Sequence, residues 1–162
     1  LDAAAITCAD VLAASVAGHG GRVVMTPHHG EMAALTGASI EEIGAEADRY
    51  AIDIARKFRA VVVLKAGRTV IAGPDGALLD YESDCVGLAT GGSGDVLAGI
   101  IGGLLARGAA PPVAAAWGVW LHGEAGRRCA ERIGPIGFLA RDLSAHVPGL
   151  MAGMAEGSVV AQ

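Results

Sequence analysis

Hydrophobic and polar residues follow one another along the chain in blocks that are typical of an α/β fold. Residues 3–17 repeat apolar side chains at helical spacing and run into a glycine-rich stretch, so we predict a helix there. Residues 22–26 are a short β-branched run that ends before a proline, and residues 61–64 are the most apolar β-branched run of the chain. Both runs are predicted to be strands, and the second should be covered on both faces.

Helices are expected between and after these strands. Residues 30–35 fit one short helix, and Ser39 with Glu42 forms a capping-box pattern for a longer helix that continues through Phe58. In the second half we predict a helix that follows a glycine-rich segment and ends at Ala106, one from Pro111 to about Ile133, and a short one over residues 140–146. The tail after Pro148 gives little signal.

After the central strand the pattern changes to strand, turn and strand. Residues 69–72 and 77–81 flank a Gly-Pro-Asp-Gly turn, which is typical of a β-hairpin. The chain shows no internal repeat and no linker composition. We therefore predict one α/β domain with a mainly parallel sheet, an added antiparallel hairpin and flanking helices.

Charge and cysteine content narrow the classes of partner. The 162 residues carry 12 Lys and Arg against 17 Asp and Glu, without a basic cluster longer than Arg127-Arg128, which argues against nucleic-acid or anionic-membrane binding. The longest uncharged apolar run, residues 96–106, is well short of the roughly 20 residues that span a bilayer. Three widely separated cysteines indicate neither a disulfide framework nor a zinc site, and this fits a reducing cytoplasm.

The segment Thr90-Gly91-Gly92-Ser93-Gly94-Asp95 is the strongest chemical signal. Its small residues precede an apolar helix, where backbone N–H groups lack intrahelical partners and the helix dipole is positive. Gly91, Gly92, Ser93 and Gly94 would form an anion hole, and Asp95 could take a proton from a hydroxyl that attacks a bound phosphate. A tight turn with Asp95 as a capping charge explains the same letters equally well. The letters exclude a Walker A loop, a dinucleotide fingerprint and a serine-hydrolase elbow.

A second polar segment, Thr26-Pro27-His28-His29-Gly30-Glu31, lies where a strand ends and a helix begins. Ligand-binding groups gather at such strand ends in open α/β sheets. His28 could donate a hydrogen bond to a substrate, and Glu31 could hold a Mg²⁺-bound water near phosphates. The alternative is a pair of surface histidines followed by a first-turn helix charge. A zinc site is a weaker alternative, because adjacent histidines rarely converge on one ion.

The third segment is the turn Lys65-Ala66-Gly67-Arg68-Thr69 after the central strand. A flexible turn in this place can wrap a nucleotide, with Lys65 available to a phosphate, although an ordinary hairpin turn is an equal alternative. His122 stands in a His-Gly-Glu triplet, but the Pro-Cys-x-x-Cys of zinc deaminases is absent. We interpret His122 as a helix residue packed near Trp117, Gly118 and Leu121.

Together the three segments resemble the ribokinase-like family, in its branch of ADP-dependent NAD(P)H-hydrate dehydratases. TPHHGEMAALTG resembles the T-P-H-P-G-E-M motif of that branch, VVVLKAGRTVIAGPDG its strand, nucleotide turn and hairpin, and LATGGSGDVLAGIIGGLLARG its signature helix entry. WLHGEAGRRCAE and GFLARDLSAHVPGLM resemble its closing helices. Ala4, His29, Ala66 and Cys85 differ from the residues that are usual in the branch.

The resemblance implies a cytoplasmic metabolite-repair lyase that restores NADH and NADPH from their hydrates while consuming ADP or ATP, with Mg²⁺ as a cofactor. It implies nucleotide contacts from Lys65, Ala66, Gly67, Arg68, Thr69 and Gly94, and substrate contacts from His28 and Asp95. Asp95 would be the catalytic base and Glu31 would place the metal through water. We also expect a homo-oligomer.

By the same resemblance, residues 1–162 correspond to the C-terminal part of a single ribokinase-like dehydratase domain. We therefore expect the N-terminal part of the fold to lie upstream in the native polypeptide, where an epimerase domain is a further option. Two other functions stay open at this point. One is a small-molecule kinase of the same fold, acting on a thiazole, pyrimidine or sugar, and the other is a non-catalytic nucleotide-binding module.

Overall fold

A four-stranded mixed sheet forms the centre of the protein. The computed structural model describes residues 1–8, 11 and 13–155. The strands lie in the order β1 (Val24–Met25), β2 (Val61–Leu64), β3 (Arg68–Ala72) and β4 (Leu78–Glu82). β1 pairs with β2 in parallel, whereas β2, β3 and β4 pair antiparallel. The expected hairpin is thus confirmed as β3 and β4.

The parallel part of this sheet is smaller than the sequence pattern indicated. Besides the β1–β2 pair it includes an isolated parallel bridge between His28 and Lys65. The first residue of the chain also runs beside β1, because the Leu1 amine donates to the Val24 carbonyl at 2.7 Å and the Leu1 carbonyl accepts from Thr26 N at 3.0 Å. Antiparallel pairing therefore accounts for most of the ladder in the described residues.

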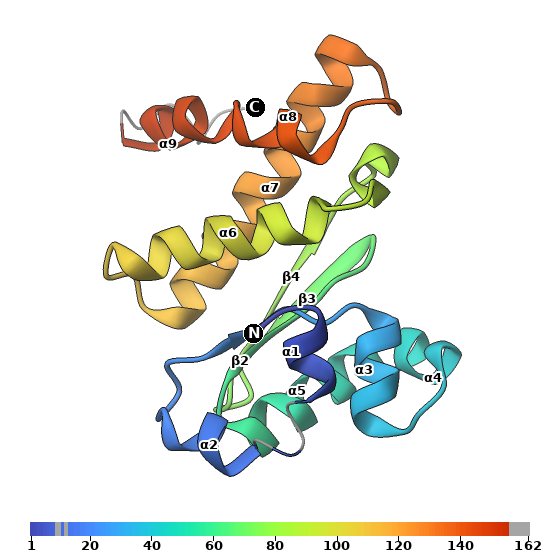
Figure 1. Ribbon diagram of the computed structural model, residues 1–162, viewed down its shortest axis with the longest axis vertical. Coiled ribbons are helices and arrows are strands. Elements are labelled where there is room, and N and C mark those ends of the chain that lie inside the picture. Colours follow the sequence, from blue (N-terminus) through green and yellow to red (C-terminus); the bar gives the residue numbers. More distant parts are fainter. Residues whose placement is uncertain (9–10, 12, 156–162) are drawn as a thin grey trace.

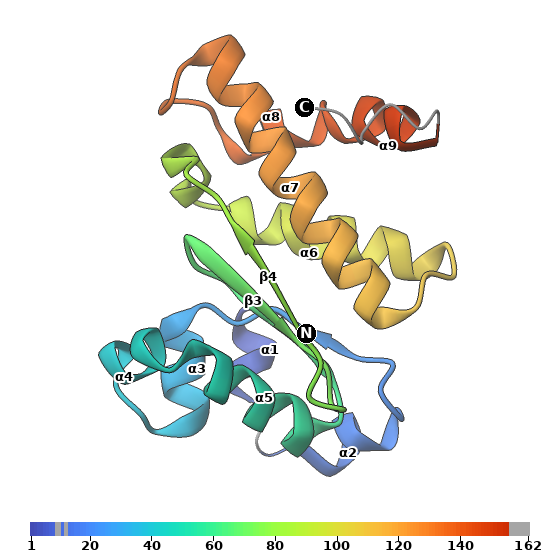
Figure 2. The same ribbon diagram turned by 180° about the vertical axis from the view of Figure 1, so that it is seen from behind.

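Two helical layers cover the sheet (Figures 1 and 2). One face carries α1 (Ala4–Thr7), α2 (Ala13–Gly18), α3 (His29–Thr36), α4 (Ile40–Ala45) and α5 (Ala47–Phe58). The other face carries α6 (Ser93–Ala106) and α7 (Pro111–Ile133), preceded by the short 3₁₀ helix η1 (Val86–Ala89). The last helices, α8 (Ala140–Ser144) and α9 (Val147–Ala155), pack against α7 beyond the sheet.

The central strand β2 is buried on both faces, as its apolar run predicts. Val62 and Leu64 enter the core beneath the first helical layer, which also holds Phe58. Val61 and Val63 enter the core shared with α6 and α7. A third cluster lies among α7, α8 and α9, so the final helices have a core of their own.

Two of the predicted helices are divided in the structure. Residues 3–17 give α1 and α2, with residues 9, 10 and 12 outside the described part. The capping box of Ser39 and Glu42 is present, but the helix it opens ends at Ala45, directly after the poor helix former Gly44. Helix α9 was not predicted. It is held in place by tertiary packing, because its Leu150 is buried in the third core, and such packing leaves little signal in the local sequence. None of the helices in the described residues is long and apolar enough to cross a bilayer.

Candidate active site

A pocket of about 650 Å³ opens between the sheet and the second helical layer. Its walls come from the turn after β2, the segment from β4 to η1, the first turn of α6 and the middle of α7. Seven of the residues singled out in the sequence line it: His28, Lys65, Ala66, Gly67, Thr69, Ser93 and Gly94. The three sequence segments therefore meet at one cavity.

The first turn of α6 presents free backbone N–H groups next to this pocket. Gly92 is the N-cap and has φ +85°, a left-handed conformation that glycine adopts without strain. Ser93 N donates to the Thr90 carbonyl, whereas the amides of Gly94 and Asp95 donate to no acceptor among the described residues. Because these N–H groups lie at the positive end of a 14-residue helix, they can bind an anion.

Asp95 lies in this first turn but does not line the pocket. Its side chain is exposed, and its carboxylate lies on the side of Gly92. Gly91 and Gly92 are exposed as well and stand outside the pocket wall. The part of the glycine-rich segment that faces the cavity is therefore Ser93 and Gly94.

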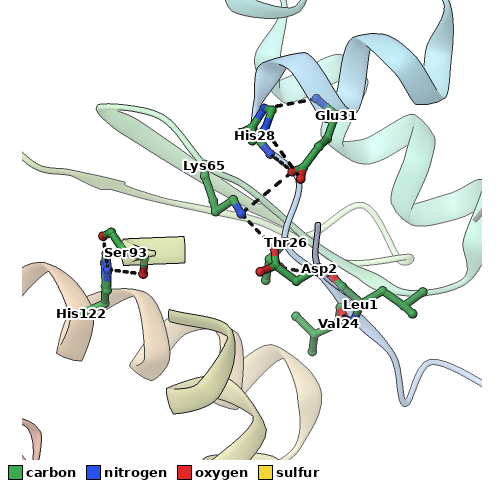
Figure 3. A network of polar contacts seen from close by, with 9 residues as sticks. All are labelled: Leu1, Asp2, Val24, Thr26, His28, Glu31, Lys65, Ser93 and His122. Carbon is green, nitrogen blue, oxygen red and sulfur yellow. Dashed lines mark hydrogen bonds and ion pairs between the residues drawn. The ribbon is translucent and has the colours of Figure 1, made fainter. Parts of the chain in front are cut away.

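Lys65 reaches from the end of β2 to the start of α6. Its ammonium makes an ion pair with Asp2 Oδ1 at 2.9 Å and lies 4.0 Å from Glu31 Oε2 (Figure 3). A Cβ atom placed on Gly94 would come within 3.2 Å of the same nitrogen. The positive charge of Lys65 therefore adds to that of the helix terminus, where a phosphate would be stabilised.

Asp2 holds Lys65 in this position. Burial by itself raises the pKa of the Asp2 carboxyl, but the hydrogen bonds from Thr26 and Lys65 outweigh burial, and the net pKa is lowered. Thr26 Oγ1 lies 2.6 Å from Asp2 Oδ1. Asp2 is therefore ionised at neutral pH and can balance the charge of Lys65. The sequence reasoning did not include Asp2 in the site.

His28 is the N-cap of α3 and completes a capping box with Glu31. Its Nδ1 accepts from Glu31 N at 3.2 Å, and Glu31 Oε2 accepts from His28 N at 2.8 Å. A neutral ring that accepts at Nδ1 carries its proton on Nε2, so His28 is a donor at that nitrogen. Histidine is an unusual cap, which is why the sequence pattern gave no sign of this role.

The two remaining candidates have their side chains engaged outside the pocket. The Arg68 guanidinium pairs with Asp48 at 2.8 Å and with Asp80 at 3.3 Å on the exposed face of the hairpin. The Glu31 carboxylate is nearly buried between His28 and Lys65. In the described residues we find no group of three His, Cys, Asp or Glu side chains that could hold a metal ion.

The sequence predicted Ser93 for this site but missed His122 in the pocket wall and the contact between the two residues. His122 Nε2 lies 2.9 Å from Ser93 Oγ and 3.0 Å from the Ser93 carbonyl oxygen (Figure 3). Burial lowers the pKa of His122, and the nearby charge of Lys65 lowers it further, although the hydrogen bond to the Ser93 backbone acts in the other direction. His122 is therefore neutral at pH 7. The position of His122 in a helix was predicted, but its contact from α7 to Ser93 in α6 was not.

Tyr81 closes the pocket on the side of the hairpin. Its ring lies against Gly123 so closely that a Cβ atom on Gly123 would overlap the phenol oxygen. Burial raises the pKa of the Tyr81 hydroxyl, and the charge of Glu124 raises it further. Tyr81 thus stays protonated and joins β4 to α7.

Comparisons with known proteins identify the family to which this chain belongs. The family model described as NAD(P)H-hydrate dehydratase matches residues 1–149. An ADP-dependent (S)-NAD(P)H-hydrate dehydratase of Xanthomonas campestris is 48% identical over 128 residues, which cover 79% of this chain and 44% of the relative. The chain thus spans less than half the length of that relative.

Solved structures agree with the sequence comparison. The ADP/ATP-dependent NAD(P)H-hydrate dehydratase of Bacillus subtilis, co-crystallised with ATP and Mg²⁺ and soaked with CoA, superposes with a TM-score of 0.76 at 35% identity, covering 80% of this chain and 48% of that one. A ribokinase-like superfamily protein of Enterococcus faecalis gives a TM-score of 0.71 at 31% identity, covering 94% and 51%. The chain therefore has a ribokinase-like fold and belongs to the NAD(P)H-hydrate dehydratase family.

Proposed function

We propose that this chain carries the nucleotide-binding and catalytic part of an ADP-dependent NAD(P)H-hydrate dehydratase. The observation that supports the proposal best is the meeting of three groups at one pocket: the start of α6, the ammonium of Lys65 and the ring of His28. The chain's membership of the NAD(P)H-hydrate dehydratase family supports the choice of this reaction.

The proposed nucleotide contacts are at the end of the pocket nearest Lys65. The turn from Lys65 to Thr69 is closed by a hydrogen bond from Thr69 Oγ1 to the Ala66 carbonyl at 3.0 Å, so Ala66 and Gly67 can offer backbone groups to a nucleotide. Arg68 would contribute through its main chain, because its side chain is paired on the outer face of the hairpin. Gly94 N and Lys65 Nζ would bind the phosphates.

The proposed chemistry transfers a phosphoryl group and then eliminates it. Asp95 takes the proton of the hydrate's hydroxyl, whose oxygen attacks the terminal phosphorus of ADP and releases AMP. The phosphorylated hydrate then loses phosphate as the ring nitrogen donates its electron pair, and loss of a ring proton restores NADH or NADPH. His28 Nε2–H would bind the hydrated nicotinamide. For this reaction the Asp95 carboxylate has to lie beside the bound substrate. Because this side chain is exposed and outside the pocket wall, ligand binding must bring the two together.

A Mg²⁺ ion is proposed to accompany the phosphates, where it would neutralise their charge. The described residues supply no three-ligand cluster, so phosphate and water oxygens would make up most of its coordination, as is common for this ion. Glu31 is the protein group that we propose to contact one of those waters. Its carboxylate oxygen lies 4.0 Å from Lys65 Nζ, close to where we propose that the phosphates bind.

The proposal is tested by mixing the chain with NADH hydrate and ADP while following NADH absorbance and phosphate release. Recovery of absorbance with release of phosphate supports the dehydratase, and ATP in place of ADP determines the preferred nucleotide. Formation of a stable phosphorylated product would instead indicate a kinase. Nucleotide binding without any turnover would indicate a non-catalytic module.

We propose a reducing cytoplasmic location, a homo-oligomeric state and residues 1–162 as the C-terminal part of a single domain. The free thiols of Cys8, Cys85 and Cys129 are consistent with that location. Size-exclusion chromatography with light scattering measures the oligomeric state.

A further inference from the structure

The contact between Ser93 and His122 determines which atom carries the histidine proton. The Ser93 carbonyl oxygen, 3.0 Å from His122 Nε2, can only accept a hydrogen bond. If Nε2 were unprotonated, its lone pair would face that oxygen and repel it. If Nε2 carries the proton, both the carbonyl oxygen and Ser93 Oγ, at 2.9 Å, can accept from it. The geometry therefore favours the Nε2–H tautomer.

This tautomer leaves the hydroxyl hydrogen of Ser93 free. Ser93 Oγ then accepts from His122, and this oxygen has no other polar partner within the described part of the chain. Ser93 is only 4% exposed, so its hydrogen cannot be directed into bulk water. The space that the residue does face is the pocket, next to Gly94 and Lys65.

A phosphate in the pocket would meet a partly completed set of donors. The Gly94 amide and the Lys65 ammonium are positioned for an anion in the pocket, whereas the amide of Ser93 is already used by the Thr90 carbonyl. An ionised phosphate accepts hydrogen bonds and donates none. Ser93 can therefore take part through its hydroxyl, provided that His122 acts as the donor in their contact.

We propose that His122 is a positioning residue that turns the Ser93 hydroxyl into a hydrogen-bond donor to the nucleotide phosphate. The inference rests on the nucleotide binding of the proposed function. It assigns Ser93 a side-chain contact with the ligand, and it assigns His122 an effect that is exerted through Ser93 alone.

The test compares the binding of ADP and adenosine by isothermal titration calorimetry. Ser93→Ala and His122→Leu should each weaken ADP binding roughly tenfold, the size expected for one lost hydrogen bond to a charged group. Binding of adenosine, which has no phosphate, should stay unchanged in both variants. A general disturbance of the pocket would instead weaken both ligands, and that result would overturn the proposal.

Three further variants separate positioning from packing. His122→Gln keeps an amide N–H donor near the position of Nε2 and should restore most of the ADP affinity that His122→Leu loses. The double variant Ser93→Ala with His122→Leu should bind ADP as the single variants do, because both remove the same contact. His19→Leu, at an exposed turn away from the pocket, is the matched control and should bind like the unaltered chain. Additive losses in the double variant would contradict the proposal.

The position of the proton is measured without any ligand. Nitrogen NMR of the histidine rings should show protonated Nε2 and unprotonated Nδ1 in His122, and Ser93→Ala should shift the Nε2 resonance. A His122 ring protonated on Nδ1 would overturn the inference whatever the chain binds. Failure of the unaltered chain to bind ADP would contradict the proposed function and with it the phosphate contact, while the tautomer result would still stand by itself.

Discussion

Lys65 is the residue on which the charges of the site converge. Its ammonium is held between the carboxylate of Asp2, at 2.9 Å, and the start of α6 at Gly94. An ion pair of this kind, largely shielded from water, fixes a long side chain that would otherwise sample many rotamers. A phosphate could therefore bind without first ordering the lysine, which favours tight binding.

Gly94→Ala should separate binding from stability. The added methyl group would lie 3.2 Å from Lys65 Nζ and push the ammonium aside, so we expect ADP affinity to fall roughly tenfold. Alanine in a helix is no worse than glycine, and the free energy of unfolding should stay equal or rise by up to about 1 kcal/mol. Titration calorimetry and urea unfolding measure the two quantities.

Gly99→Ala is the matched control for this variant. It changes the same residue type in the same helix, but a Cβ atom there meets nothing within 4 Å. ADP binding should be unaffected. Equal ADP affinity in Gly94→Ala and in the unaltered chain would show that Lys65 and Gly94 do not hold the phosphate.

Asp95→Asn should remove turnover while leaving nucleotide binding intact. The amide cannot accept the proton of the hydrate's hydroxyl, and we expect turnover to fall by roughly 10²–10⁴-fold. The side chain is exposed and outside the pocket wall, so ADP affinity should change little. The comparison uses the absorbance assay on an active preparation. Undiminished turnover in Asp95→Asn would exclude Asp95 as the base.

At the level of elements, glycines set how closely α7 approaches its neighbours. A Cβ atom on Gly118 would overlap the side chain of Ile101 in α6, and one on Gly126 would lie 2.6 Å from Leu88 Cδ2 in η1. Together with the contact of Gly123 on Tyr81, these positions bring α7 against three different elements. Because the pocket lies between the same elements, this packing also sets its width.

Gly118→Ala should lower stability even though alanine favours a helix. Crowding of Ile101 in a close-packed core costs about 1–3 kcal/mol, which exceeds the gain of about 1 kcal/mol from helix propensity. Urea unfolding should therefore show a lower midpoint for Gly118→Ala and an equal or higher one for Gly99→Ala. The same direction of change in both variants would contradict the packing argument.

Most elements were predictable because their signals are local. The apolar run of β2, the Gly-Pro-Asp-Gly turn of the hairpin, and the capping box of Ser39 each depend on a few consecutive residues. Helix α9 lacked such a signal, since it contains a proline and two glycines and is held by burial of Leu150 in the third core. Tertiary packing supplied what local propensity did not.

The candidate site was predictable only in part, for the same reason. That the start of α6 and the Lys65 turn belong to one site could be predicted from the order of residues within each segment, and both line the pocket. The contact of Lys65 with Asp2 joins residues 63 positions apart, and that of Ser93 with His122 joins residues 29 positions apart. Such contacts depend on how helices and strands dock, which no single window of sequence contains.

For the whole molecule, the buried His122 predicts a loss of stability on acidification. Its pKa in the folded protein is lower than the ordinary value of 6.5, so below pH 6.5 the unfolded chain takes up a proton that the folded protein does not. The contribution of His122 to the free energy of unfolding is fully present above pH 6.5. It is lost as the pH falls through the lowered pKa that His122 has in the folded protein. Asp2 contributes in the same sense, but only below its ordinary pKa of 3.8.

Urea unfolding from about pH 7.5 to about pH 5.5 measures this effect, with the fluorescence of Trp117 and Trp120 in α7 as the signal. The free energy of unfolding should fall more steeply in the unaltered chain than in His122→Gln, which has no titrating group. His19→Gln is the control and should follow the unaltered chain. If the free energy of unfolding falls equally steeply with pH in the unaltered chain and in His122→Gln, burial does not lower the pKa of His122.

The pocket takes its walls from both sides of the protein. His28 caps a helix of the first layer, whereas Leu97 and Val119 belong to the core of the second. A ligand that contacts all three residues would bind both helical layers at once. Separating the two layers would then also require the ligand to dissociate from one of them. Saturating ligand should accordingly slow amide hydrogen exchange in α3 and in α7 together, and the melting temperature should climb with ligand concentration.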